Sequence, residues 1–172
     1  MARKRAPDSD MSRSVGLLIS ILVCYPELGT INFDPRHRRL KFTFLLTRRQ
    51  TEAEFEALRA KLTASLEAYS LLVDRTFECF ELTRSSLGDI TVLEVTRDVT
   101  TLSREEIALI IELIRESCGS SLVAERSESM MDEDITLQEE LIEEMLDDLR
   151  ETREEKNLIA FREEGRVMVF NK

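Results

Sequence analysis

The chain has few of the residues that mark specialised classes of protein. Its 172 residues include no tryptophan, one histidine, three prolines and five glycines. So little glycine and proline excludes a fibrous or low-complexity chain, and isolated glycines cannot form a phosphate-binding loop. Gly-x-Ser-x-Gly and His-Glu-x-x-His patterns are also missing, and the lone His37 has no recognisable base or nucleophile as a partner. No catalytic residue, cofactor site or metal site is therefore predicted.

The three cysteines, Cys24, Cys79 and Cys118, are widely spaced, and each lies in an apolar run. None forms a Cys-x-x-Cys pair, so neither a zinc site nor a redox motif is indicated. Free cysteine in such runs behaves as a small buried hydrophobic residue. Buried free thiols in turn predict a reducing compartment, and we expect a cytoplasmic protein.

Long hydrophobic runs are missing too. Val15–Val23 is too short to span a bilayer, so no membrane association is predicted. Basic residues before this run and Cys24 after it give a superficial likeness to a lipoprotein signal, but Asp8 and Asp10 interrupt the basic part. We therefore expect a flexible basic and polar tail over 1–14 and a single domain over 15–172.

Negative charge is concentrated in one segment. Residues 125–156 hold fourteen acids and four bases, an excess that equals the whole net charge of −10. The rest of the chain is therefore neutral in sum. A composition of this kind, with 42% hydrophobic residues, is typical of a globular protein.

The first half of the chain is rich in strand patterns. Val15–Tyr25 is a continuous apolar run ended by Pro26, which predicts a strand buried on both faces. Gly29–Asp34 and Arg39–Leu46 alternate between apolar and polar residues around a turn, which predicts a hairpin. One face of its second strand is formed by Leu40, Phe42, Phe44 and Leu46.

Two helices are indicated by capping boxes, Thr51–Glu54 and Ser103–Glu106. The first helix has an apolar stripe at spacings of three and four, formed by Phe55, Leu58, Leu62, Leu66, Tyr69 and Leu72. The second has a stripe of Ile107, Ile110, Ile111, Ile114 and Cys118, widened by Leu109 and Leu113. Between the helices, Phe77–Leu82 and Asp89–Arg97 predict a second hairpin around Ser85–Gly88.

The predicted fold class is α+β, with two β-β-α units on a mostly antiparallel sheet. The units make up a duplicated core over 15–118, although chance recurrence of a common motif explains the likeness equally well. A loop is expected over 119–133. Residues 134–172 predict an acidic amphipathic helix, about Asp134–Lys156, and a terminal hairpin of Leu158–Phe161 and Val167–Phe170 docked on the sheet.

The acidic helix is the first candidate surface. Like charges recur every four residues along it, which costs helix stability unless a cationic surface or apolar docking offsets it. The pattern is compatible with two interpretations: the acidic face binds a basic partner, or the charges are simply solvated. The candidate partner-docking residues are Glu139, Glu140, Glu143, Glu144, Asp147 and Asp148.

The basic hairpin is the second candidate surface. Its candidate phosphate-contacting residues are Arg36, Arg38, Arg39, Lys41, Arg48 and Arg49. Basic groups beside aromatic rings on a sheet are typical of RNA binding. However, Phe42 and Phe44 share their face with Leu40 and Leu46, so we expect these rings in the core and not on a stacking platform.

Taken together, these patterns predict a non-catalytic cytosolic regulatory or protein–protein interaction domain of bacterial type. Its partner is expected to be a protein; a basic partner and self-association into a homo-oligomer are both left open. The alternative is an RNA-associated module that binds phosphates through residues 36–49. A third hypothesis is an enzyme with an active site of scattered carboxylates, but no sequence motif supports it.

Overall fold

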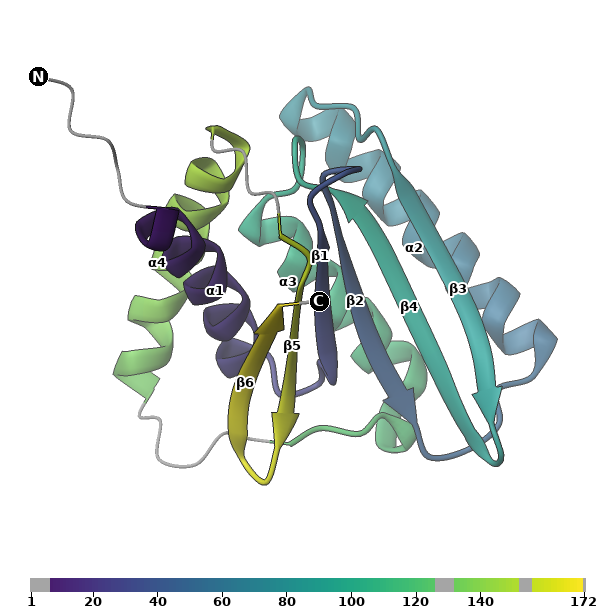
Figure 1. The fold of residues 1–172 in the computed structure, drawn as a ribbon. Helices are drawn as coiled ribbons and strands as arrows, with labels where there is room; N and C mark the ends of the chain where they lie inside the picture. Colours follow the sequence, from purple (N-terminus) through teal and green to yellow (C-terminus); the bar gives the residue numbers. More distant parts are fainter. Residues whose placement is uncertain (1–6, 126–131, 152–155, 172) are drawn as a thin grey trace, which may run out of the picture.

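A computed structural model describes residues 7–125, 132–151 and 156–171 (Figure 1). These residues form four α-helices, one short 3-10 turn and a six-stranded sheet. In chain order the elements are α1 (Pro7–Cys24), β1 (Thr30–Asp34), β2 (Arg39–Leu46), α2 (Glu52–Val73), β3 (Phe80–Leu87), β4 (Ile90–Asp98), α3 (Arg104–Cys118), the turn η1 (Gly119–Ser121), α4 (Asp132–Glu151), β5 (Leu158–Glu163) and β6 (Arg166–Asn171).

The strand order in the sheet is β3-β4-β2-β1-β5-β6, and every neighbouring pair is antiparallel. The α+β class is therefore confirmed, and both β-β-α units share one sheet. The second strands of the two hairpins, β2 and β4, pair along their whole length, from Arg39 opposite Asp98 to Leu46 opposite Thr91. This pairing places the two units on either side of the β2–β4 seam as if related by a two-fold rotation.

The prediction of a strand over Val15–Tyr25 is wrong, because all of this segment except Tyr25 lies in α1. Residues 7–14, assigned to a flexible tail, also belong to this helix. A short continuous apolar run fits a buried helix as well as a buried strand. Here α1 packs against α4 on one side and against β5 and β6 on another, so Leu17, Leu18, Ile21 and Leu22 are all buried. With so much of its surface covered, α1 has no clear polar face from which a helical period could be recognised.

The first capping box is formed as predicted. The Thr51 hydroxyl accepts a hydrogen bond from the Glu54 backbone N–H, and the Glu54 carboxylate accepts one from that of Thr51. The stripe is buried from Phe55 to Leu66, but Leu72 is 86% exposed, because the last turn of α2 extends beyond the sheet and ends at Asp74 in the left-handed conformation. The apolar stripe is therefore shorter than the helix.

The second capping box is only half formed. Ser103 accepts from the backbone N–H of Glu106, as expected. The Glu106 carboxylate does not return to the cap but pairs with Arg97 in the core. The Glu106 side chain therefore binds Arg97, at the end of the predicted hairpin, in place of the helix cap.

The second hairpin is shifted from its predicted position. Strand β3 begins at Phe80 and continues to Leu87, and the turn lies at Gly88, whose φ is +62°. The shift arises because β3 is an edge strand with mostly exposed side chains, so its sequence has little apolar alternation to mark its ends.

The C-terminal part is close to the prediction. Helix α4 buries Ile142, Leu146 and Leu149, and it packs mainly on α1. It begins within the predicted loop, at Asp132, and the predicted end of the helix at Lys156 follows residues 152–155, which lie outside the described part. The docked terminal hairpin is confirmed, since β5 pairs with β1 and β6 pairs with β5.

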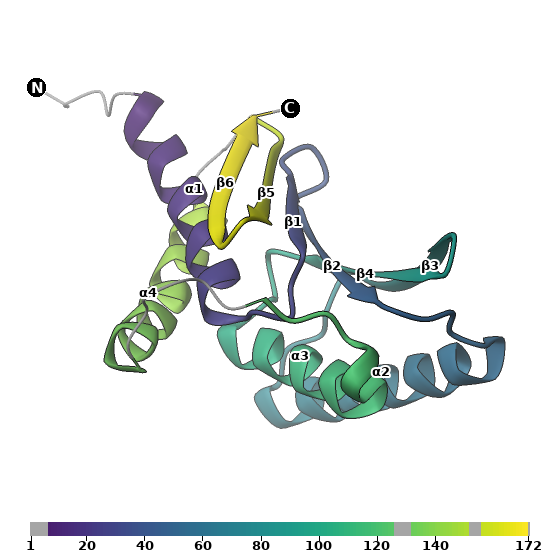
Figure 2. The ribbon, with the colours of Figure 1, turned by 90° about the horizontal axis from the view of Figure 1, so that it is seen from below.

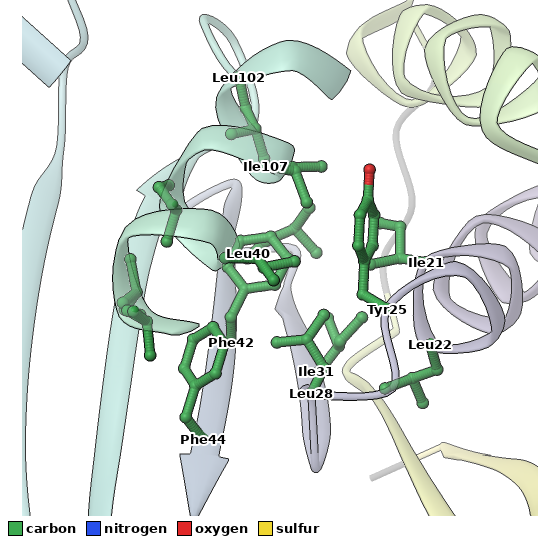
Figure 3. Close-up of a cluster of buried hydrophobic side chains, with 14 of the residues drawn as sticks. Ile21, Leu22, Tyr25, Leu28, Ile31, Leu40, Phe42, Phe44, Leu102 and Ile107 are labelled. Atoms are coloured by element: carbon green, nitrogen blue, oxygen red, sulfur yellow. The ribbon is translucent and has the colours of Figure 1, made fainter. Parts of the chain in front are cut away.

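All four helices lie on one side of the sheet (Figure 2). The core fills the space between them and the sheet. Its centre includes Leu40, Phe42 and Phe44 of β2, with Ile21 and Tyr25 reaching in from the end of α1 (Figure 3). No described helix covers the opposite side of the sheet, which we call the open face.

Candidate binding trough on the open face

The open face is concave. Figure 2 shows β1, β5 and β6 turned steeply away from β2, β4 and β3, with the helices outside the bend and the open face inside it. The bend explains why several side chains there are half-buried although no helix lies over them. These are Thr30 and Asn32 of β1, Lys41, Thr43 and Leu45 of β2, Glu94 and Thr96 of β4, and Ile159 and Phe161 of β5.

Two clefts lie on this face, one at each end of the β1–β2 pair. The apolar cleft has a volume of about 340 Å³ and is lined by Pro26, Glu27, Leu28, Gly29, Thr30, Thr43, Leu45, Val123, Glu125, Phe161 and Arg162. The basic cleft has a volume of about 490 Å³ and is lined by Asn32, Phe33, Asp34, Arg36, His37, Arg39, Lys41, Thr96, Asn157 and Leu158.

The two clefts adjoin along the strands. On β1, Thr30 lines the apolar cleft and Asn32, two positions later, lines the basic cleft. On β2, Thr43 lines the apolar cleft and Lys41, two positions earlier, lines the basic cleft. Residues two apart on a strand point to the same side. The clefts therefore adjoin along β1 and β2, and we call the two together the trough.

Unpaired polar atoms gather in the trough. Among the described residues, four buried side-chain atoms have no hydrogen-bond partner: Glu27 Oε2, Asn32 Oδ1, Gln50 Oε1 and Arg162 Nε. Three of these four belong to residues that line the trough. Buried polar atoms are nearly always paired in folded proteins, so Glu27, Asn32 and Arg162 are unusual in retaining unpaired atoms beside the trough.

Glu27 and Arg162 are held firmly by their other atoms. Glu27 is only 6% exposed, and its Oε1 accepts from the Arg115 Nε at 2.9 Å. The Arg162 guanidinium donates to the Pro26 carbonyl at 2.9 Å and to the carbonyls of Leu22 and Glu125. Burial lowers the pKa of Arg162 from its ordinary value, against the opposing effect of the nearby carboxylates. The side chains of Glu27 and Arg162 are thus fixed at the border of the apolar cleft, each with one buried atom unpaired.

The basic cleft carries two cations without an ionic partner. Lys41 Nζ pairs with Glu94 at 3.0 Å, and Asp34 accepts from His37 Nδ1 at 2.7 Å. Burial opposes ionisation of Asp34, but the hydrogen bonds from His37 and Arg36 outweigh it and lower the pKa of this carboxyl. Within the described part of the chain, the guanidinium groups of Arg36 and Arg39 form no salt bridge.

The structure divides the six basic residues of the predicted phosphate surface. Arg36, Arg39 and Lys41 line the basic cleft. Arg38 instead donates to the Leu149 carbonyl at the end of α4. Arg48 and Arg49 lie at the opposite end of β2, where Arg48 binds Glu54 at 2.5 and 3.1 Å and Arg49 donates to the Gly88 carbonyl. The six residues therefore do not form one patch.

The rings of the basic hairpin belong to the core, as expected. Phe42 is 1% exposed and Phe44 is fully buried. A different aromatic pair lies on the open face, where the rings of Phe161 and Phe170 stack with their centroids 5.4 Å apart. This pair arises from the β5–β6 hairpin and is not part of the predicted surface.

The six acids of the predicted docking helix differ in their surroundings. Glu143 accepts from the first backbone N–H of α3, that of Arg104, at 2.9 Å, Asp147 pairs with Arg150, and Asp148 lies 3.3 Å from Arg13. Glu140 and Glu144 are exposed, and Glu139 is half-buried. The apolar stripe of α4 docks on α1, as the sequence analysis allowed.

The cysteines are free and buried, as predicted. Burial, with a smaller contribution from the charge of Glu139, raises the pKa of Cys24 to about 12. The described residues contain no group of three or more potential metal ligands. None of the described helices has the length and apolar character needed to cross a membrane.

Sequence reasoning missed the residues that complete the trough. Asn32 enters the sequence predictions only as part of the alternating strand Gly29–Asp34, and Glu27 and Arg162 are given no role there. No local signal could have revealed Glu27 and Arg162, because these two residues lie far apart in the chain. Comparisons with models of protein families, with curated proteins and with solved structures found no match.

Proposed function

We propose that this protein is a non-catalytic interaction module of a regulatory kind, which takes an extended segment of a partner protein into the trough. The observation that carries the proposal is the trough along β1 and β2, in which an apolar cleft adjoins a basic cleft. An extended chain carries side chains of different chemistry at regular intervals along its length. Such a chain can place an apolar side chain in one cleft and a charged side chain in the other.

The shape of the site favours an extended chain as the ligand and not a compact molecule. The trough follows the β1–β2 pair from Gly29 to Asp34, which at about 3.3 Å per residue amounts to roughly 17 Å. Its two parts also differ in chemistry, one apolar and one basic. A segment of five or six residues fits both the length and the change in character.

RNA binding receives less support from the same site. The apolar cleft is bordered by the carboxylates of Glu27 and Glu125, which repel phosphates. Two of the basic residues that would have bound phosphates, Arg48 and Arg49, make intramolecular contacts away from the trough. The net charge of −10 adds a general repulsion of nucleic acid.

A test is selection of random twelve-residue peptides on the immobilised protein, followed by affinity measurements on purified variants. Thr43→Arg places a long side chain in the middle of the trough. Thr83→Arg makes the same change on β3, at an exposed position of the same sheet face outside both clefts. We expect selected peptides to lose about tenfold or more in affinity for Thr43→Arg and to keep it for Thr83→Arg.

Thermal melts must show that both variants are folded. Failure of the library to yield any peptide above background would contradict the proposal. So would selected peptides that bind Thr43→Arg as well as they bind the unchanged protein.

A further inference from the structure

We infer that the partner segment carries a large apolar side chain and, four positions away, a carboxylate. The inference rests on the proposed function and adds the chemistry of the segment to it. It follows from the different lining of the two clefts and from the strand positions that separate them.

The apolar cleft is built to receive a side chain. Leu45 and Phe161 reach into it from β2 and β5, and Val123 closes it from the segment after α3. Gly29 contributes no side chain of its own, and a Cβ at this position would lie 3.5 Å from the Thr43 carbonyl oxygen. A volume of about 340 Å³ therefore remains free beside half-buried apolar groups, where a leucine or phenylalanine side chain would be removed from water.

The basic cleft is built to receive one negative charge. Arg36, Arg39 and Lys41 line it against the single carboxylate of Asp34, although the chain as a whole carries −10. Lys41 and Asp34 already have partners, whereas Arg36 and Arg39 form no salt bridge with any described residue. Guanidinium groups bind carboxylates with paired, charge-assisted hydrogen bonds.

The spacing follows from the strands beneath the trough. Thr30 lies in the apolar cleft and Asp34 in the basic cleft, four positions apart on β1, and Leu45 and Lys41 have the same separation on β2. An extended segment lying along these strands rises by a similar distance per residue, about 13 Å over four positions. Its side chains alternate in direction, so residues four apart point to the same side and residues three apart do not.

A carboxylate fits the site better than a phosphate of a nucleic acid strand. A strand that filled the trough would carry a phosphate at every nucleotide, including beside Glu27 and Glu125 in the apolar cleft. A peptide with a single acid places its charge only at Arg36 and Arg39. The separation of apolar and basic clefts therefore favours a protein ligand.

The experiment uses fluorescence anisotropy with labelled nine-residue peptides in a serine and threonine background. The first peptide has phenylalanine at position 3 and glutamate at position 7. We expect it to bind at least about tenfold more tightly than the same peptide with glutamine at position 7 or serine at position 3. Moving the glutamate to position 6 should remove the gain, since its side chain then points away from the trough.

Protein variants assign each preference to its cleft. In Arg36→Gln/Arg39→Gln the glutamate and glutamine peptides should bind equally, and in Leu45→Ser the preference for phenylalanine should fall. The matched control is Arg59→Gln/Lys61→Gln, which removes two positive charges from exposed positions of α2. This control should keep both preferences.

Several outcomes would overturn the inference. A glutamate preference that survives Arg36→Gln/Arg39→Gln, or equal binding of the peptides with spacings of four and three, would do so. Tight binding of a ten-nucleotide uridine strand that depends on the same two arginines would also do so, because the anion would then be a phosphate. Peptides selected from the random library that bind in the trough without this pattern would leave the proposed function standing and defeat only the inference.

Discussion

Two buried polar side chains on opposite faces of the sheet differ in their hydrogen bonding. Under the helices, Arg97 is fully buried, yet each of its three side-chain nitrogens has a partner. On the open face, Asn32 has a buried oxygen with no partner among the described residues. The charge of Arg97 is therefore satisfied within the chain, whereas Asn32 has unmet bonding capacity. This contrast supports our proposal that the open face carries the binding site.

The buried Arg97 shows how a charge is held in the core. Its guanidinium binds the Glu106 and Asp98 carboxylates, the Cys79 carbonyl and the Thr101 hydroxyl, and it lies 5.5 Å from the centre of the Phe77 ring. Burial raises the pKa of Glu106 despite this contact with Arg97. Burial also tends to raise the pKa of Asp98, but the hydrogen bond from Thr101 and the charge of Arg97 outweigh this effect, so the pKa of Asp98 is lowered. This ionic group lies within the second β-β-α unit, since Arg97 comes from β4 and Glu106 from α3.

The largest expected effect compares two positions of β2, three residues apart, that point to opposite faces. Phe42→Ala should lower the free energy of unfolding by about 3–5 kcal/mol, because it removes a ring from the packed core. Leu45→Ala, on the open face, should cost about 1 kcal/mol. Chemical denaturation of both variants measures the difference. Equal losses would show that the open face is packed as tightly as the core.

The second prediction concerns the buried ionic group. Glu106→Gln should lower the free energy of unfolding by about 3 kcal/mol, since it leaves Arg97 without one of its two carboxylates in a site closed to water. The neighbouring Glu105→Gln is the control. It is exposed, its contact with Arg104 at 3.4 Å lies at the surface, and its effect should stay within about 0.5 kcal/mol. A loss no larger in Glu106→Gln than in Glu105→Gln would refute a structural role for the buried pair.

The smallest expected effect has the opposite sign. Asn32→Val removes a buried unpaired oxygen and introduces a residue that suits a strand, so it should raise the free energy of unfolding by about 1 kcal/mol. Peptides selected on the unchanged protein should nevertheless bind the variant more weakly. Thr83→Val, outside the trough on the same face, should change neither quantity by a comparable amount. Destabilisation by Asn32→Val would mean that the amide supports the fold and is not reserved for a ligand.

Local patterns were enough to predict most of the elements. The alternation of Arg39–Leu46, the capping box at Thr51 and the terminal hairpin each depend on residues close together in the chain, and all three are present in the structure. The acidic helix was also predicted, since its apolar stripe is continuous from Ile142 to Leu149. In these cases the chemistry that sets the local conformation agrees with the packing that later surrounds it.

Helix α1 and the trough were decided by tertiary structure. The run from Val15 fits a buried strand and a buried helix alike, and packing against α4 and the β5–β6 hairpin, more than a hundred residues away, determines which one forms. The apolar cleft likewise brings together Arg162 of β5 and Pro26, whose carbonyl accepts from Arg162 although it lies 136 positions earlier. An amino-acid sequence by itself encodes the period and the caps of each element. Which polar atoms remain unpaired depends on segments that meet only in the folded chain, and here that meeting produces the trough.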